Sequence, residues 1–172
     1  MFFDRAILAI SLVLSSGEIA SATDSVRTTI NDHAAIVADT ELWIDAEPKA
    51  VWAILTDVPK WTEWLPEFVS ARLDGPLAPG TTLYWEPQGQ KIVSRLVVVE
   101  PPHRLIWNGS GGAVHVWELA SVRNGTMLRN AESIEQWTFP EASGEQSKFL
   151  RETLGVWNAR LAARVKERRK TE

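Results

Sequence analysis

The first hydrophobic pattern along the chain has a period of two. Within residues 34–45 (AAIVADTELWID), five apolar or small residues recur at every second position. The residues on the predicted buried side are Ile36, Ala38, Thr40, Leu42 and Ile44. Alternation of this kind is typical of a strand that buries one face.

Two short helices are predicted directly after this strand. Pro48 lies in a first helical turn, where its missing N–H costs no hydrogen bond. Pro59 prevents a simple continuation, and Asp57 is a suitable cap for a second helix that runs through Trp64. The apolar stripe of the first helix comprises Val51, Ile54 and Leu55.

Six further strands and a long helix are predicted in the rest of the chain. Each strand is bounded by turn residues, and the last two are joined through Asn124-Gly125, a strong hairpin signal. The predicted strands are 68–74, 81–87, 91–100, 103–109, 113–122 and 126–137. The helix covers 145–170, and its apolar stripe is Leu150, Leu154, Trp157, Leu161 and Val165. Antiparallel strands with helices set to one side indicate an α+β fold in a single domain, residues 34–170.

Composition narrows the classes of function. The chain has 172 residues, a formal net charge of −4 and no cysteine. It therefore lacks the basic surface expected of a nucleic-acid binder, and it can form neither a thiol nucleophile nor a thiolate metal site. The three histidines show no metal-ligand spacing and no phosphate-binding loop is present. We therefore expect neither a metal nor a cofactor.

The N-terminus has the three parts of a secretory signal. Arg5 precedes an apolar run over residues 6–14, and Ala20-Ser21-Ala22 offers small residues for cleavage. The run is too short to span a bilayer, which needs ~20 apolar residues. We expect a signal peptide over residues 1–22, a flexible lead-in over 23–33, and a mature protein that is exported to a bacterial periplasm or secreted, without a stable membrane anchor.

The Asn124-Gly125 turn sets a register for the last hairpin. If the loop has two residues, Trp117 lies opposite Glu132 and His115 opposite Ile134. Leu119 then lies opposite Asn130, and all six residues share one face. The bulk of His115, Trp117 and Leu119 favours that face for the interior. Glu118 and Arg129 become diagonal neighbours on the other face.

Five segments in one order resemble a known superfamily. They are VWAILTDVPKWTEWLP, LDGPLAPGTTL, VVEPPHRLIWNG, HVWELASVRNGT and LGVWNARLAARVKER, and they cover about residues 36–168. The sequence resembles the START/Bet v 1-like (SRPBCC) superfamily in its polyketide cyclase/dehydrase and lipid-transport branch. The resemblance implies a helix-grip fold, in which a curved seven-stranded antiparallel sheet surrounds a long C-terminal helix and leaves an apolar cavity.

The resemblance also implies which residues face the cavity. We expect polar contacts from His115, Asn130 and Glu132 in a mainly apolar lining. The expected apolar or aromatic ligand contacts are Trp64, Trp107, Trp117, Leu154 and Trp157. Trp117 and Trp157 have a simpler interpretation as core, and Glu132 has one as the partner of a neighbouring polar group.

Three functions remain open on this basis. The first is an exported binding protein that holds a hydrophobic small molecule or lipid under its long helix. The second is a cyclase- or hydratase-like enzyme that uses His115 and Glu132 as an acid/base pair. The third is a structural or interaction domain whose cavity has collapsed. The sequence identifies neither the ligand nor the oligomeric state.

Overall fold

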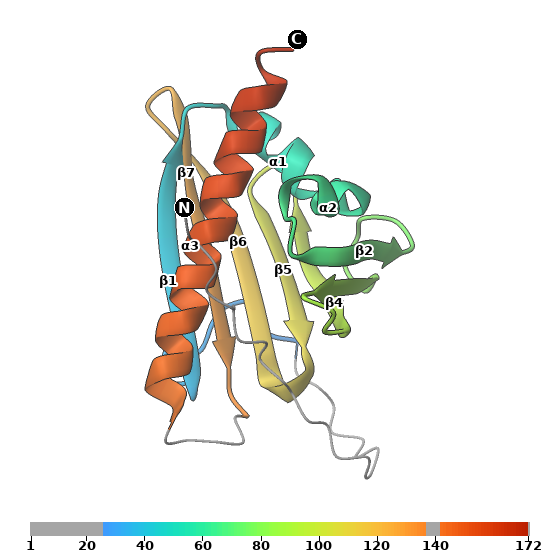
Figure 1. Ribbon diagram of the computed structural model, residues 1–172, viewed down its shortest axis with the longest axis vertical. Helices are drawn as coiled ribbons and strands as arrows, with labels where there is room; N and C mark the ends of the chain where they lie inside the picture. The colour runs from blue at the N-terminus through green and yellow to red at the C-terminus, as the bar shows by residue number, and fades with distance from the viewer. Residues whose placement is uncertain (1–25, 137–141, 172) are drawn as a thin grey trace, which may run out of the picture.

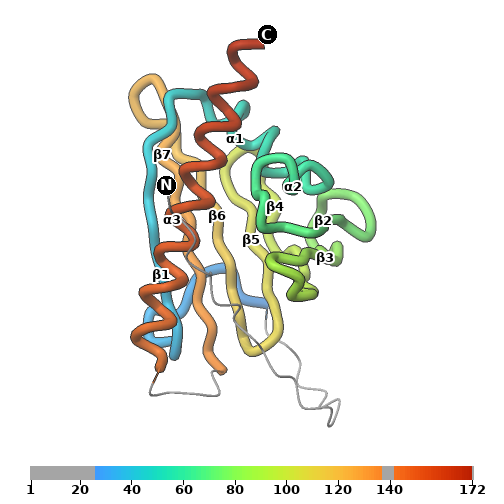
Figure 2. Tube along the Cα trace, viewed as in Figure 1, coloured from blue at the N-terminus to red at the C-terminus, as the bar shows by residue number. Residues whose placement is uncertain are grey.

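A long helix lies across one face of a seven-stranded sheet (Figure 1 and Figure 2). The computed structural model describes residues 26–136 and 142–171, so the expected signal peptide, residues 1–22, lies outside the described residues. All neighbouring strands are antiparallel. The predicted α+β helix-grip architecture is confirmed.

The strands follow the predicted order along the chain, and the first and last pair with each other. Across the sheet they are β1 (Ile36–Ile44), β7 (Gly125–Ile134), β6 (Ala113–Val122), β5 (Arg104–Gly109), β4 (Ile92–Glu100), β3 (Thr82–Pro87) and β2 (Phe68–Asp74). The helical elements are α1 (Pro48–Leu55), the 3-10 turn η1 (Val58–Lys60), α2 (Trp61–Trp64), the 3-10 turn η2 (Ser110–Gly112) and α3 (Ser143–Arg168). Within the described ranges no helix has both the length and the apolar character of a membrane-spanning segment.

A β-bulge interrupts the regular pairing of β4 with β5. Leu96 pairs with Trp107 but Val98 pairs with Ile106, so Val97 is an extra residue in β4. A bulge of this kind bends its strand and increases the local twist. Leu96 belongs to the core under α3, whereas Val98 packs in a second cluster on the opposite face of the sheet. Because of the bulge, Leu96 and Val98, which are two residues apart, point to opposite faces of the sheet.

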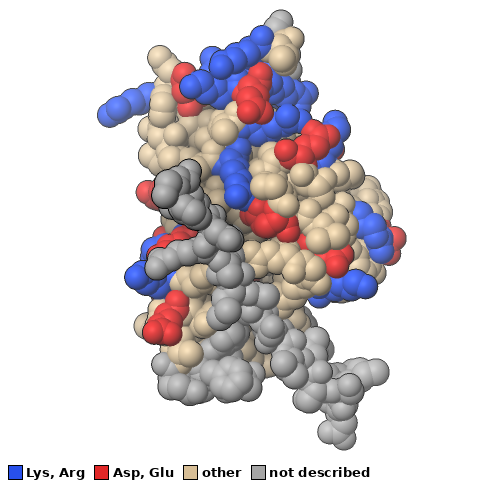
Figure 3. All heavy atoms as spheres, in the orientation of Figure 1, with Lys and Arg blue, Asp and Glu red and all other residues tan. Residues whose placement is uncertain are grey.

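The apolar stripe of α3 packs against the sheet as predicted. Its five members, Leu150, Leu154, Trp157, Leu161 and Val165, are all buried. Burying such a side chain fully contributes about 1.5–3 kcal/mol relative to leaving it exposed. Basic side chains gather around the C-terminal end of α3 (Figure 3), where cations suit the negative pole of the helix dipole.

The tryptophans of α1 and α2 belong to the core. Trp52, Trp61 and Trp64 are 8%, 3% and 7% exposed, respectively. The indole Nε1 of Trp61 donates a hydrogen bond to the carbonyl of Leu55, 2.8 Å away. That bond satisfies a carbonyl that the end of α1 leaves free. It also fixes the bend that Pro59 introduces between the two helices.

The register of the last hairpin differs by two residues from the one predicted. Val122 pairs with Gly125, so the loop residues are Arg123 and Asn124, and Arg123 takes a positive φ of 57°. Gly125 belongs instead to β7, where an added Cβ would meet the carbonyl oxygen of Ile44 at 2.5 Å. The glycine is required by this close approach of β1 and not by the turn.

The corrected register leaves each side chain on its predicted face, because a shift of two positions preserves the alternation. His115 now lies opposite Glu132, and Trp117 opposite Asn130. On the outer face Glu118 lies directly opposite Arg129, and the two form an ion pair at 2.9 Å. Hydrogen bonds to Asp39, and secondarily to Glu118, raise the pKa of Arg129 above its usual range.

Residues 26–33 make contacts on the outer face of the sheet that the sequence did not predict. The amide and carbonyl of Arg27 each bond the side chain of Asn108, both at 3.0 Å. The Asn31 amide donates to Ser133 Oγ at 3.0 Å, and Ile30 packs on the second apolar cluster. Hydrogen bonds from Asn31, and then Arg27, lower the pKa of Glu135. This part of the lead-in is therefore tied to the sheet.

Candidate functional site

A cavity of about 320 Å³ lies between the N-terminal half of α3 and the sheet. Its floor comes from β3 to β7 and its roof from α3, which supplies Phe149, Leu150, Thr153 and Trp157. The turn between β3 and β4 also borders it, with the polar side chains of Gln88, Gln90 and Lys91. The surface that lines the cavity is mainly apolar.

Aromatic rings form the deep walls of the cavity. They include Trp85 from β3, Trp107 from β5 and Trp157 from α3. The ring of Trp85 contacts the rings of both other tryptophans. The imidazole of His115, on β6, stacks on Trp107 with ring centroids 4.5 Å apart. It lies nearly parallel to Trp157 at 6.1 Å and to Trp117 at 5.5 Å. These contacts fix the plane of the imidazole ring.

A chain of buried polar side chains links α3 to the sheet beside the cavity. Thr40 (β1) bonds the backbone carbonyl of Asn130 (β7) at 2.7 Å and Asn158 (α3) at 2.9 Å. Asn158 bonds the side chain of Asn130 at 2.9 Å, and Asn130 bonds His115 Nε2 at 2.8 Å. Asn130, Asn158 and His115 are at most 2% exposed. The chain satisfies these buried amides, which would otherwise be costly.

This series of hydrogen-bonded side chains ends at His115, whose other ring nitrogen faces Glu132. His115 Nδ1 lies 3.3 Å from Glu132 Oε2, but the two atoms lack hydrogen-bond geometry. Within the part of the chain that the structure describes, Nδ1 has no hydrogen-bond partner. Both side chains line the cavity. A histidine and a carboxylate so placed can accept or hold a proton next to a bound molecule.

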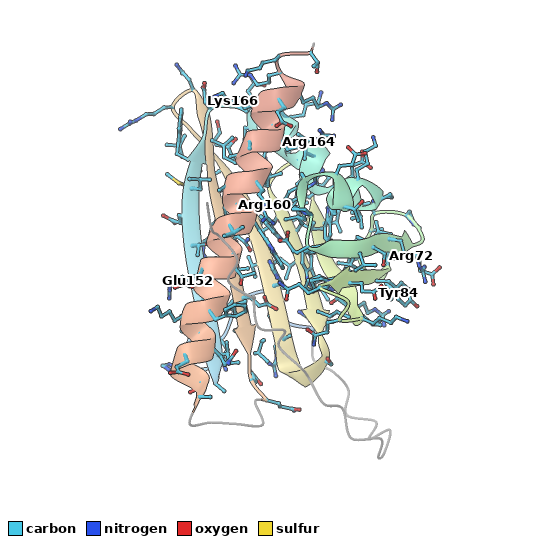
Figure 4. The ribbon with its side chains drawn as sticks, viewed as in Figure 1. Arg72, Tyr84, Glu152, Arg160, Arg164 and Lys166 are labelled. Carbon is cyan, nitrogen blue, oxygen red and sulfur yellow. The ribbon has the colours of Figure 1, made fainter. Side chains whose placement is uncertain are left out.

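Glu67 attaches α3 to the segment that leads into β2. Its Oε1 accepts a hydrogen bond from Trp157 Nε1 at 2.8 Å, and its Oε2 pairs with Arg160. Arg164, one turn further along α3, pairs with Glu63 of α2. Figure 4 shows Arg160 and Arg164 on the side of α3 that faces α2. Glu67 also borders the cavity, so this attachment holds one of its walls.

The cavity brings together four of the eight predicted ligand contacts. Trp107, His115, Glu132 and Trp157 line it. The other four, Trp64, Trp117, Asn130 and Leu154, are buried but do not. Trp64 borders a separate hollow between α2 and the C-terminal end of α3. Asn130 acts on the site through His115, and Leu154 packs in the core.

Some residues of the site were not predicted. Ser94, Phe149 and Glu67 line the cavity, and Asn158 completes the polar chain. Asn158 lies next to Trp157 and four residues after Leu154, so the helical spacing could have indicated that its side chain is buried. Trp85 and Leu83 of β3 were both candidates from the alternation of that strand, and of the two only Trp85 lines the cavity. Among residues 26–136 and 142–171, no cluster of three metal-ligating side chains is present.

Comparison with known families gives one match. The model of the family described as polyketide cyclase/dehydrase and lipid transport matches residues 36–166. A search of curated protein sequences found no significant match.

Solved structures with a similar fold have low sequence identity. The protein TTHA0849 from Thermus thermophilus superposes with a TM-score of 0.65 at 18% identity, over 76% of this chain and 97% of that one. A START superfamily protein from Mycobacterium smegmatis gives 0.62 at 17% identity, over 76% and 97%. The di-domain ARO/CYC protein BexL, from the BE-7585A biosynthetic pathway, gives 0.61 at 21% identity over 77% of this chain. The match covers 49% of BexL, about half its length.

Proposed function

The chain belongs to the polyketide cyclase/dehydrase and lipid transport family, and on that premise we propose that it binds a hydrophobic small molecule or lipid between α3 and the sheet. The observation that carries the proposal is the cavity itself: its lining is mainly apolar, with His115 and Glu132 as polar groups inside. Apolar walls with a few convergent polar groups are typical of small-molecule sites.

The size of the cavity favours a compact ligand. Its volume of about 320 Å³ is near the lower end of the ~300–1,000 Å³ range of small-molecule sites. A ring-containing molecule suits this volume better than a lipid with two acyl chains. Removing ~200 Å² of apolar ligand surface from water would contribute ~5 kcal/mol before the costs of association. The same volume argues against a domain whose cavity has collapsed.

Filling the cavity is expected to abolish binding. In the Thr153→Trp variant a large ring replaces a small side chain on the roof, so we expect the affinity for the uncharged probe N-phenyl-1-naphthylamine to fall at least ~tenfold. Probe fluorescence during titration measures the affinity. Ala159→Trp, at an exposed position of the same helix, is the matched control and should bind as the wild type does.

Two results would contradict the binding function. One is equal probe affinity of both variants and the wild type. The other is the absence of any response to apolar probes, together with no co-purifying small molecule in native mass spectra of protein from its own host.

A second candidate function is acid/base catalysis of the cyclase or hydratase type. The observation in its favour is the approach of His115 Nδ1 to Glu132 Oε2, 3.3 Å apart at the cavity wall. Incubating a small-molecule extract of the host with wild type and with Glu132→Gln tests it. Catalysis predicts a species consumed only by the wild type, whereas identical extracts after both incubations argue for binding alone.

We further propose that the protein is exported to the periplasm. The support is in the sequence: Arg5, the apolar run over residues 6–14, and the small residues at 20–22. Fractionation of cells that express the full chain, followed by intact-mass measurement, tests the proposal. A periplasmic product that lacks residues 1–22 is expected. A cytosolic product with its N-terminus intact would contradict export.

A further inference from the structure

We propose that the ligand carries a hydroxyl group or another hydrogen-bond donor, and that Asn130 and Asn158 are positioning residues that present His115 Nδ1 to this donor. The proposal rests on the binding function given above and adds the chemical group that the site recognises. It follows from the direction of the hydrogen bonds in the buried polar chain.

One backbone carbonyl fixes the direction of the chain at its first two bonds. The carbonyl of Asn130 can only accept, so the Thr40 hydroxyl donates its single proton to it across 2.7 Å. Thr40 Oγ1 must then accept its second bond, at 2.9 Å, from Asn158 Nδ2. The side-chain amide of Asn158 is thereby oriented, with its oxygen turned away from Thr40.

The remaining two bonds follow from that orientation. Asn158 Oδ1 accepts from Asn130 Nδ2 at 2.9 Å, and this leaves Asn130 Oδ1 facing His115 Nε2 at 2.8 Å. An amide oxygen can only accept, so the proton in this bond belongs to Nε2. In a neutral imidazole the other nitrogen is then an acceptor. For a neutral ring, which is part of the proposal, the polar chain therefore makes His115 Nδ1 an acceptor at the cavity wall.

The surroundings of Nδ1 call for a donor. Glu132 Oε2 lies 3.3 Å from it, and an unprotonated carboxylate oxygen can only accept a hydrogen bond. His115 is 1% exposed, and Nδ1 has no hydrogen-bond partner among the described residues. A ligand hydroxyl in the cavity would donate its single proton to His115 Nδ1. An ether or ketone oxygen at the same place would put a third acceptor against His115 Nδ1 and Glu132 Oε2.

Three related probes test which group the site recognises. Titration calorimetry with 2-naphthol, 2-methoxynaphthalene and naphthalene compares a donor, an acceptor and a purely apolar ring. We expect 2-naphthol to bind at least ~tenfold more tightly than its methyl ether, because a site built to bond a hydroxyl rejects analogues that lack it. Equal affinities of 2-naphthol and the ether would overturn the proposal.

Variants of the polar chain test the positioning role. Asn158→Leu removes the amide in the middle of the polar chain. Thr40→Val removes the hydroxyl that orients the Asn158 amide and keeps the shape of the side chain. In both we expect the 2-naphthol preference to fall below ~threefold, and in Thr40→Val we expect naphthalene affinity to be retained. Thr82→Val, on β3 and outside the chain, is the control for Thr40→Val. An unchanged preference in a folded Thr40→Val protein would overturn the role of the chain.

The tautomer of His115 can be observed directly. Long-range proton–nitrogen spectra of the ligand-free protein should show a neutral ring with its proton on Nε2, with the exposed His33 and His103 as internal references. A proton on Nδ1, in either a neutral or a charged ring, would overturn the proposal. If no probe binds, naphthalene included, the binding function itself fails. If naphthalene binds without any preference for 2-naphthol, only the inference about the donor fails.

Discussion

Replacing Gly125 with alanine is expected to destabilise the protein by about 3 kcal/mol, at the upper end of the usual cost of overpacking. An added Cβ would lie 2.5 Å from the carbonyl oxygen of Ile44 and 2.9 Å from the ring of Trp43. The carbonyl belongs to the end of β1, so it can move only if the β1–β7 pairing moves with it. Denaturant titration of the purified variant measures the free energy of unfolding.

A second glycine provides the control for this substitution. Gly155 lies on an exposed part of α3, where an added Cβ would meet no atom within 4 Å. Alanine at this position should stabilise the protein by about 0.5–1 kcal/mol, because glycine weakens a helix interior. A Gly125→Ala protein as stable as the wild type would show that the end of β1 can shift to accommodate a methyl group.

Truncating Leu154 to alanine is expected to lower the free energy of unfolding by about 2–5 kcal/mol. Its side chain is 0% exposed and packs in the main core under α3. Truncation removes apolar contacts and leaves a void that the surrounding side chains fill only in part. Thermal or denaturant unfolding measures this loss.

The same variant separates core from ligand contact. Leu154 does not line the cavity, so the affinity of folded Leu154→Ala protein for N-phenyl-1-naphthylamine should remain close to that of the wild type. Val156→Ala, at a position that is 41% exposed, should change stability by less than about 0.5 kcal/mol. A large loss of probe affinity in Leu154→Ala would show that Leu154 contacts the ligand, as the sequence predicted.

The order of elements could be predicted because each follows from a local pattern. The alternation in β1 and the stripe in α3 each report one buried face. The last hairpin shows how far such reasoning extends. The Asn124-Gly125 pair was interpreted as the turn, but the requirement for Gly125 comes from β1, which is remote in sequence. The faces were still correct, since a shift of two residues does not exchange them.

The position of the cavity could not be predicted from the same patterns. Spacing along α3 shows that Leu154, Trp157 and Leu161 face the sheet, but it does not show where the opposite side chains leave space. The cavity lies under Phe149, Leu150, Thr153 and Trp157, whereas Leu154, between them along the helix, packs in the core and does not line it. Asn158 was missed for a related reason, since its partners Thr40 and Asn130 come from two other elements.

The buried amide of Asn158 also determines how far along the sheet the helix is placed. An apolar stripe that repeats every three or four residues could pack almost as well after sliding by one turn, roughly 5.4 Å. Such a slide would take Asn158 away from both Thr40 and Asn130 and leave amide groups buried without partners. Buried polar contacts can thus select one axial register among several apolar ones. Because Phe149, Leu150 and Thr153 form the roof, the same register determines the depth of the space beneath them.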